Sequence, residues 1–157
     1  MYVKENRPRE SLASSFVELS NLALESIKAM GRVTIVCGPI TTGGRGSAEA
    51  NMRALALTIR HLKYLGIPVF DQCPFEPTLW SLKDQWEKAG NQGYCTPILT
   101  DFYLPLYKSG HIYRAYFLPG WESSYGARWE RRELAILQVQ IIDLEEEQIK
   151  GILQKEP

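Results

Sequence analysis

Glu130 is the residue of this chain whose type and position most clearly suggest chemistry. A helix that begins near Ser124 would place this carboxylate on the same face as Ala127 and Leu134, so we expect it to point inward. Its neighbours three and four places away include no basic residue, and Gly126 leaves space beside it. A glutamate near a helix N-terminus, where the dipole favours the ionised form, suits a nucleophile or an anchor for ligand hydroxyls. The alternative is a partly solvated residue with an arginine partner from elsewhere in the fold.

A second candidate region is the segment 38–47, which is rich in glycine and hydroxyl residues and follows a β-branched run at 33–37. Backbone N–H groups at glycines can approach a ligand closely, and Arg45 adds a cation, so the segment suits a phosphate or another anion. It has neither the Gly-Lys-Ser/Thr ending of a Walker A loop nor the GxGxxG pattern. A plain flexible connection from strand to helix is the alternative. The candidate ligand-binding residues here are Gly38, Pro39, Ile40, Gly43, Gly44 and Arg45.

The elements that must position these residues are predicted from apolar periodicity. Helices are expected at 12–30, 48–65, 81–88, 101–107 and 144–153, with a further helix carrying Glu130, and strands at 33–37, 67–70, 112–118 and 139–142. Strands that alternate with helices predict an α/β fold of three layers, α/β/α, with a mostly parallel sheet of four to five strands, flavodoxin-like or Rossmann-like. The carboxyl ends of the strands at 33–37 and 112–118 would bring both candidate regions to one edge. We expect residues 1–31 to form an N-terminal helical extension and residues 32–157 the α/β domain.

Composition and charge exclude several classes of function. The chain has 157 residues, and its 18 basic side chains balance 18 acidic ones, so nothing favours a nucleic acid polymer or a membrane as partner. Three cysteines without CxxC spacing and two histidines predict neither a disulfide framework nor a metal site. The N-terminus lacks the apolar stretch of a signal peptide, and no apolar run approaches membrane length. We therefore expect a cytoplasmic protein that uses no metal or organic cofactor.

The run Leu118-Pro-Gly-Trp-Glu-Ser-Ser-Tyr-Gly-Ala-Arg-Trp-Glu130, taken with Cys37-Gly-Pro-Ile40 and the Gly43-Gly44 pair, resembles the nucleoside 2-deoxyribosyltransferase-like superfamily. The similarity is greatest to its small uncharacterised bacterial and phage branch and to the related 2′-deoxynucleoside 5′-phosphate N-hydrolases. It covers roughly residues 33–142. In that superfamily a glutamate at the position of Glu130 attacks the anomeric carbon, or stabilises the sugar cation, as an N-glycosidic bond breaks.

Such a reaction passes through an oxocarbenium-like state and gains from a second carboxylic acid that protonates the departing base. The resemblance places this second group on the helix before the third strand, where Asp101 is the best match and Asp71 the runner-up. An N-cap of the short helix is the alternative role for Asp101.

The resemblance also bears on substrate binding. A serine six residues before the nucleophile helps to bind the 5′-phosphate in the nucleotide N-hydrolases, and this chain has Ser124 there, which is also an N-cap candidate. The tyrosine that often lies on the first strand is replaced near Ile35. Trp121 could stack on a base, although an aromatic residue beside a glycine turn is as often a packing residue. Gly126 completes the expected substrate-binding set.

These observations predict an N-glycosidase or deoxyribosyltransferase that acts on a nucleoside 5′-monophosphate or a related nucleotide. A nucleotide-binding or sensing module with little turnover is the alternative, and a protein that only binds a partner is a third hypothesis. The resemblance further implies a homodimer or larger homo-oligomer. The apolar stripe of the helix 12–30 and exposed-looking aromatic residues at Tyr103, Tyr107 and Tyr113 would serve that interface.

Overall fold

A parallel β-sheet of three strands lies at the centre of the protein, whose structure is a computed structural model that describes residues 8–41 and 43–155. The strands are β1 (Val33–Cys37), β2 (Ile112–Phe117) and β3 (Gln140–Asp143), and they are hydrogen-bonded in the order β1-β2-β3. All five residues of β1 are buried, as expected for a β-branched strand in a sheet covered on both faces. The expected α/β class is confirmed, although the sheet has fewer strands than the four to five predicted.

The missing strand is the segment 67–70, which contributes a single parallel bridge between Val69 and Thr34. Its carbonyl at Pro68 accepts from the Thr34 N–H at 2.8 Å, and the Phe70 N–H donates back to Thr34 at 2.9 Å. Proline has no N–H of its own, and the chain turns into a short helix at Cys73–Phe75, so the pairing stops after one bridge. The prediction of a full strand at 67–70 was therefore wrong, although the segment does lie beside β1.

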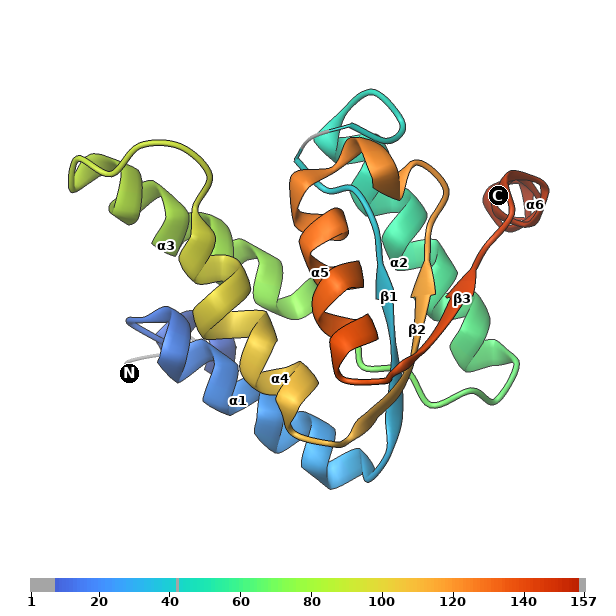
Figure 1. The fold of residues 1–157 in the computed structure, drawn as a ribbon, viewed down its shortest axis with the longest axis horizontal. Helices are drawn as coiled ribbons and strands as arrows, with labels where there is room; N and C mark the ends of the chain where they lie inside the picture. Colours follow the sequence, from blue (N-terminus) through green and yellow to red (C-terminus); the bar gives the residue numbers. More distant parts are fainter. Residues whose placement is uncertain (1–7, 42, 156–157) are drawn as a thin grey trace, which may run out of the picture.

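Helices cover both faces of the sheet (Figure 1). On one face lie α1 (Phe16–Met30), α3 (Glu76–Lys88), α4 (Leu104–Lys108) and α5 (Tyr125–Ile136), and on the other lie α2 (Ala48–Tyr64) and α6 (Glu146–Gln154). Short helical turns complete the chain at η1 (Arg9–Leu12), η2 (Cys73–Phe75), η3 (Ile98–Tyr103, a π-helical stretch) and η4 (Trp121–Ser123). Serine side chains cap α1, α2 and α5, because each accepts a hydrogen bond from the N–H three residues further on.

Helix α1 packs against its own chain. Leu19, Ala23 and Ile27 are fully buried in the core that also contains β1 residues Val33 and Ile35. The stripe that could have bound a second subunit is therefore buried in this protein's own core, where α1 packs against η3, α4 and α3 and shares one hydrophobic cluster with the α/β elements that follow it. The homo-oligomer stays a prediction, but this stripe no longer supports it.

Two further findings concern the described residues as a whole. None of their helices combines the length and the apolar character that a membrane crossing requires. Within 8–41 and 43–155, histidine, cysteine and acidic side chains form no group of three that could hold a metal ion.

Candidate active site

Glu130 lies on the inner face of α5, together with Gly126, Ala127 and Leu134. It is 9% exposed, and the Tyr107 hydroxyl of α4 donates a hydrogen bond to its Oε2. The expected inward orientation is confirmed, and the alternative of a partly solvated glutamate with an arginine partner is wrong. The small side chains one turn earlier on α5 leave the room that the sequence pattern indicated.

The surroundings of Glu130 disfavour its charge. Burial raises the pKa of Glu130 to about 7, although the hydrogen bonds from Tyr107 and from the Cys37 thiol work in the opposite direction. Burial also raises the pKa of Cys37 and of Tyr107 well above their ordinary values, so both remain protonated donors at neutral pH. The pKa of Glu130 therefore lies close to neutral pH, which is common among catalytic acids and bases.

A second buried carboxylate, Glu76, opens α3 and is 7% exposed. The Trp80 indole N–H donates to its Oε2 at 3.0 Å, and the Tyr103 hydroxyl lies 3.3 Å from its Oε1. Burial raises the pKa of Glu76, while these two hydrogen bonds lower it. The charge of Glu76 in turn raises the pKa of Glu130.

Both carboxylates line one cavity of about 300 Å³ between α3, η3 and the N-terminal half of α5. This volume is at the lower end of the range of small-molecule sites. Tyr94, Tyr103 and Trp80 give the cavity an aromatic lining. The expected residues that line it are Gly38, Ile40, Ser124, Gly126 and Glu130.

Asp101, the expected second carboxylate, is not among the described residues that line this cavity. It lies half-buried within η3, where its Oδ1 is 3.3 Å from the Thr100 hydroxyl. The runner-up Asp71 faces Lys63 at 3.7 Å and accepts the Cys73 N–H at 3.0 Å, also away from the cavity. The second buried carboxylate of the cavity is therefore Glu76 and not the expected Asp101.

The glycine-rich segment is held by the protein's own groups. Buried Asn51 accepts the Arg45 N–H at 2.7 Å and donates to the carbonyls of Ile40 and Gly43, and the Ser123 hydroxyl accepts the Gly44 N–H at 2.9 Å. These backbone N–H groups are thus already engaged, which leaves less of the anion-binding capacity that the sequence indicated.

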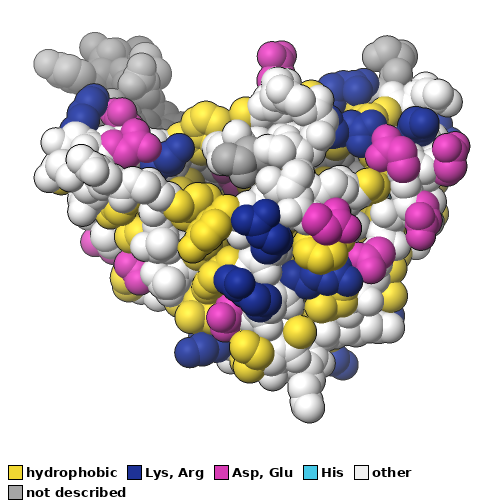
Figure 2. Space-filling model, turned by 45° about the horizontal axis from the view of Figure 1, so that its top comes forward, with side chains coloured by type: hydrophobic (Ala, Val, Ile, Leu, Met, Phe, Trp, Pro, Cys, Tyr) yellow, Lys and Arg dark blue, Asp and Glu magenta, His cyan; other side chains and the backbone are white. Residues whose placement is uncertain are grey.

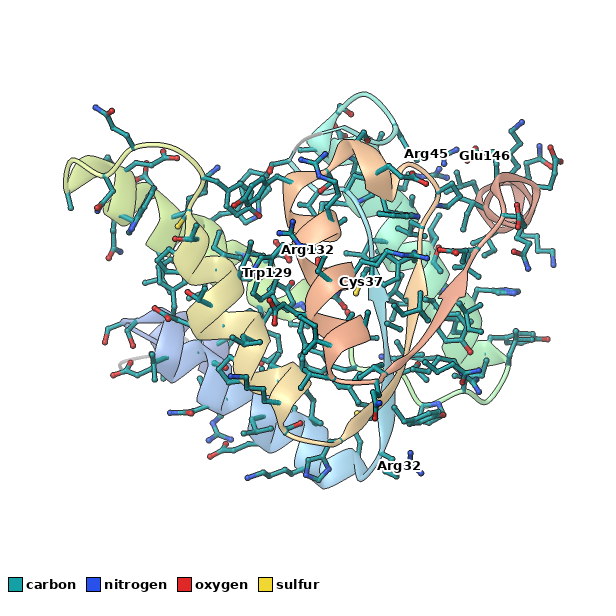
Figure 3. The ribbon with its side chains drawn as sticks, viewed as in Figure 1. Arg32, Cys37, Arg45, Trp129, Arg132 and Glu146 are labelled. Atoms are coloured by element: carbon teal, nitrogen blue, oxygen red, sulfur yellow. The ribbon has the colours of Figure 1, made fainter. Side chains whose placement is uncertain are left out.

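Arg45 itself faces the opposite side of the loop. Its guanidinium makes two hydrogen bonds to the carboxylate of Glu146, at 2.9 and 3.3 Å. Figure 3 shows the two residues next to each other at the α6 side of the molecule, well apart from Cys37. Together with Pro39, Arg45 lines a separate small hollow of about 10 Å³ rather than the main cavity. The structure therefore does not bring Arg45, Pro39, Gly43 or Gly44 to the carboxylates.

Two of the other expected residues have structural roles. Trp121 packs edge-on against Phe117 and lies under the guanidinium of Arg131, 4.1 Å from the ring centroid, outside the cavity lining. The packing alternative for Trp121 is therefore the one observed. Ser124 caps α5, since its hydroxyl accepts the Ala127 N–H at 3.2 Å, and it also lines the cavity. The N-cap role is therefore observed, and the phosphate-binding role stays a prediction.

The sequence analysis missed Glu76, Trp80, Tyr103 and Tyr107 as site residues. Tyr103 and Tyr107 are 4% and 2% exposed, so the expectation that they are exposed interface aromatics was wrong. A signal was present: Glu76 and Trp80 are four residues apart, as are Tyr103 and Tyr107, and this spacing puts each pair on one helix face. The prolines around Glu76 concealed the helix start, since α3 begins five residues before the predicted position.

The outer surface near the site shows no broad field of one sign. On the face drawn in Figure 2, basic side chains near the middle lie next to acidic ones. Arg131, for example, makes two hydrogen bonds to Asp143, at 2.6 and 3.0 Å. A charged ligand would therefore be selected by the groups inside the cavity rather than by the surface around it.

Comparison of the chain with protein-family models, with curated proteins and with solved structures found no match.

Proposed function

We propose that the protein cleaves the N-glycosidic bond of a nucleoside or nucleotide, by hydrolysis or by transfer of the sugar. The observation that carries the proposal is that Glu130 and Glu76, two buried carboxylates from different helices, line one small aromatic cavity. Breaking a bond between sugar and base develops positive charge on the sugar, which a carboxylate can stabilise or trap covalently. The resemblance to the nucleoside 2-deoxyribosyltransferase-like superfamily, with its flavodoxin-like or Rossmann-like fold, agrees with this proposal.

We assign Glu130 as the carboxylate that attacks the anomeric carbon or stabilises the positive charge that develops there. Tyr107 engages its Oε2, which fixes the orientation of the carboxylate. With a pKa of about 7, a substantial fraction of Glu130 is ionised at neutral pH, and positive charge on the sugar would favour the ionised form further. Glu76 is the second carboxylate and is assigned to the departing base.

The 5′-phosphate predicted from the sequence has mixed support. The Ser124 hydroxyl and the N-terminus of α5 lie at the cavity and suit an anion. Arg45, however, is paired with Glu146 outside it. A substrate without phosphate therefore agrees better with the charged groups in the cavity, and the monophosphate stays a prediction.

The alternative function is a binding or sensing module with little turnover. One observation favours it: the second carboxylate expected from the resemblance, Asp101, does not line the cavity. Whether Glu76 replaces it in catalysis decides between the two functions.

The test is release of free base from a panel of nucleosides and nucleoside monophosphates, with the wild type, Glu130→Gln and the exposed-site control Glu122→Gln. We expect release by the wild type and the control, and a loss of roughly a hundredfold or more for Glu130→Gln, since the amide keeps the shape but not the charge. Release at an unchanged rate by Glu130→Gln would exclude the assignment. Binding without release by the wild type would select the sensing module.

The phosphate is tested by Arg45→Ala in the same panel. Because Arg45 pairs with Glu146 outside the cavity, we expect KM for nucleosides and for monophosphates to change by less than about twofold. A selective rise of KM for the monophosphates would instead place the phosphate at the glycine-rich segment.

A further inference from the structure

The charged groups of the cavity are unbalanced. Its lining contains three carboxylates, Glu76, Glu87 and Glu130, and a single amine, Lys83. Lys83 lies 3.8 Å from Glu87, so its charge is offset by its neighbour on α3. The two buried carboxylates therefore have no basic partner among the described residues that line the cavity. Ionising them is costly unless a positive charge enters with the ligand.

The aromatic lining lies next to one of these carboxylates. Trp80 is 43% exposed, which places it at the opening of the cavity, and its indole N–H is hydrogen-bonded to Glu76. Indole is the aromatic side chain that attracts cations most strongly, and a hydrogen bond to a carboxylate polarises the ring in the favourable direction. Tyr103, also hydrogen-bonded to Glu76, adds a second aromatic surface inside the cavity. A flat, positively charged group would be stabilised by the rings and by the carboxylate together.

We propose that the base of the substrate carries a fixed positive charge, as in a pyridinium or an N7-alkylated purine nucleoside, and that Glu76 and Trp80 bind it. This inference rests on the proposed cleavage of an N-glycosidic bond. In the reaction the bond between C1′ and the ring nitrogen breaks, and its electron pair neutralises the nitrogen. Water then adds its hydroxyl group to C1′, and the second proton of that water is released.

A base of this kind requires no proton in order to leave. Glu76 is then needed as an anion that binds the charged base in the ground state, and not as a general acid. The two roles give opposite pH dependences. A counter-ion loses its effect when the pH falls and Glu76 becomes protonated, whereas an acid loses its effect when the pH rises.

The titratable groups that face Glu76 come from several elements of the fold. They are Cys73 of η2, Tyr94 of the α3–η3 loop, Tyr103 of η3, Lys83 and Glu87 of α3, and Glu130 of α5. The pKa of Cys73 is raised to about 12, and the pKa values of both tyrosines are raised above their ordinary range, by burial in each case. Burial raises the pKa of Glu76 and raises that of Glu130 to about 7, so the pH series is compared with the same series for Glu76→Gln, which removes the first of these two groups.

The base subsite is tested without turnover by calorimetric titration with 1-methylnicotinamide, a pyridinium cation, and with nicotinamide, its neutral counterpart. At pH 8 we expect the cation to bind about tenfold more tightly, and this preference to fall below about threefold in Glu76→Gln. It should weaken as the pH is lowered to 5.5. The exposed-site control Glu122→Gln should keep the wild-type preference. Equal affinity for the two compounds, or a preference that Glu76→Gln leaves intact, would overturn the inference.

Turnover is tested with nicotinamide riboside and with its reduced dihydropyridine form, which has the same sugar and nearly the same shape but no charge. Nicotinamide release from the cationic compound alone supports both the inference and the proposed function. Cleavage of neutral nucleosides with no preference for the charged ones would overturn the inference and leave the proposed function in place. Selective binding of 1-methylnicotinamide without cleavage of any nucleoside would support the inference about the subsite and contradict the enzymatic function.

Discussion

Replacing Glu130 by glutamine should stabilise the protein above neutral pH. The pKa of this carboxyl group rises from 4.5 to about 7 on folding, chiefly through burial. At about 1.4 kcal/mol per pKa unit, the ionised form costs the folded state about 3 kcal/mol. Because the folded pKa is the higher one, the free energy of unfolding loses this contribution as the pH rises from about 4.5 to above 7. Glutamine cannot ionise, so the Glu130→Gln protein should not lose this contribution to its free energy of unfolding.

The assay is chemical unfolding of the wild type and Glu130→Gln between pH 4.5 and pH 8.5. The two proteins should differ little at the acidic end and by about 3 kcal/mol at the basic end, which corresponds to roughly 6–12 °C in melting temperature for a chain of this size. Glu122→Gln should follow the wild type throughout. Parallel stability curves for the wild type and Glu130→Gln would refute the reasoning.

Two further substitutions test the surroundings of the site. Tyr107→Phe removes the donor that lowers the pKa of Glu130, so that pKa should rise by about one unit, measured by NMR titration of the side-chain carboxyl, whereas Tyr64→Phe, at a position 87% exposed, should not move it. Gly44→Ala should lower the free energy of unfolding by about 2–4 kcal/mol in urea, because φ is +71° and a Cβ would lie 2.5 Å from the Asn51 Oδ1. Gly46→Ala, with φ of +97° and nothing within 4 Å of its Cβ, should cost only about 1 kcal/mol, and equal losses at the two glycines would contradict the steric argument.

The parts of the fold that sequence analysis predicted well have a local physical signal. The helix predicted at 48–65 is α2, Ala48–Tyr64, since a serine cap and an alanine- and leucine-rich pattern define it without help from tertiary contacts. The burial of Glu130 followed from its spacing from Ala127 and Leu134 in the same helix. These features depend on residues a few positions apart.

The parts that were mispredicted depend on distant contacts. Glu76 of α3 meets Tyr103 of η3 across 27 positions of sequence. Arg45 lies outside the cavity because its guanidinium pairs with Glu146, 101 positions away in the sequence. No local sequence pattern predicts the contact of Glu76 with Tyr103 or that of Arg45 with Glu146. The residue types in both candidate regions indicated which chemistry they could perform. The sequence around each residue did not predict which distant residue it would contact.

Tyr103 and Tyr107 stand one helical turn apart, and each of their hydroxyls contacts one of the two cavity carboxylates. Their rings are stacked with centroids 6.0 Å apart, close to the pitch of a helix. The separation between Glu76 and Glu130 is thus tied to the geometry of one helical segment rather than to the flexibility of two side chains. A change of specificity toward a larger ligand would therefore require remodelling the backbone from η3 into α4, whereas exchanging either acid for a shorter one would only detach it from its tyrosine.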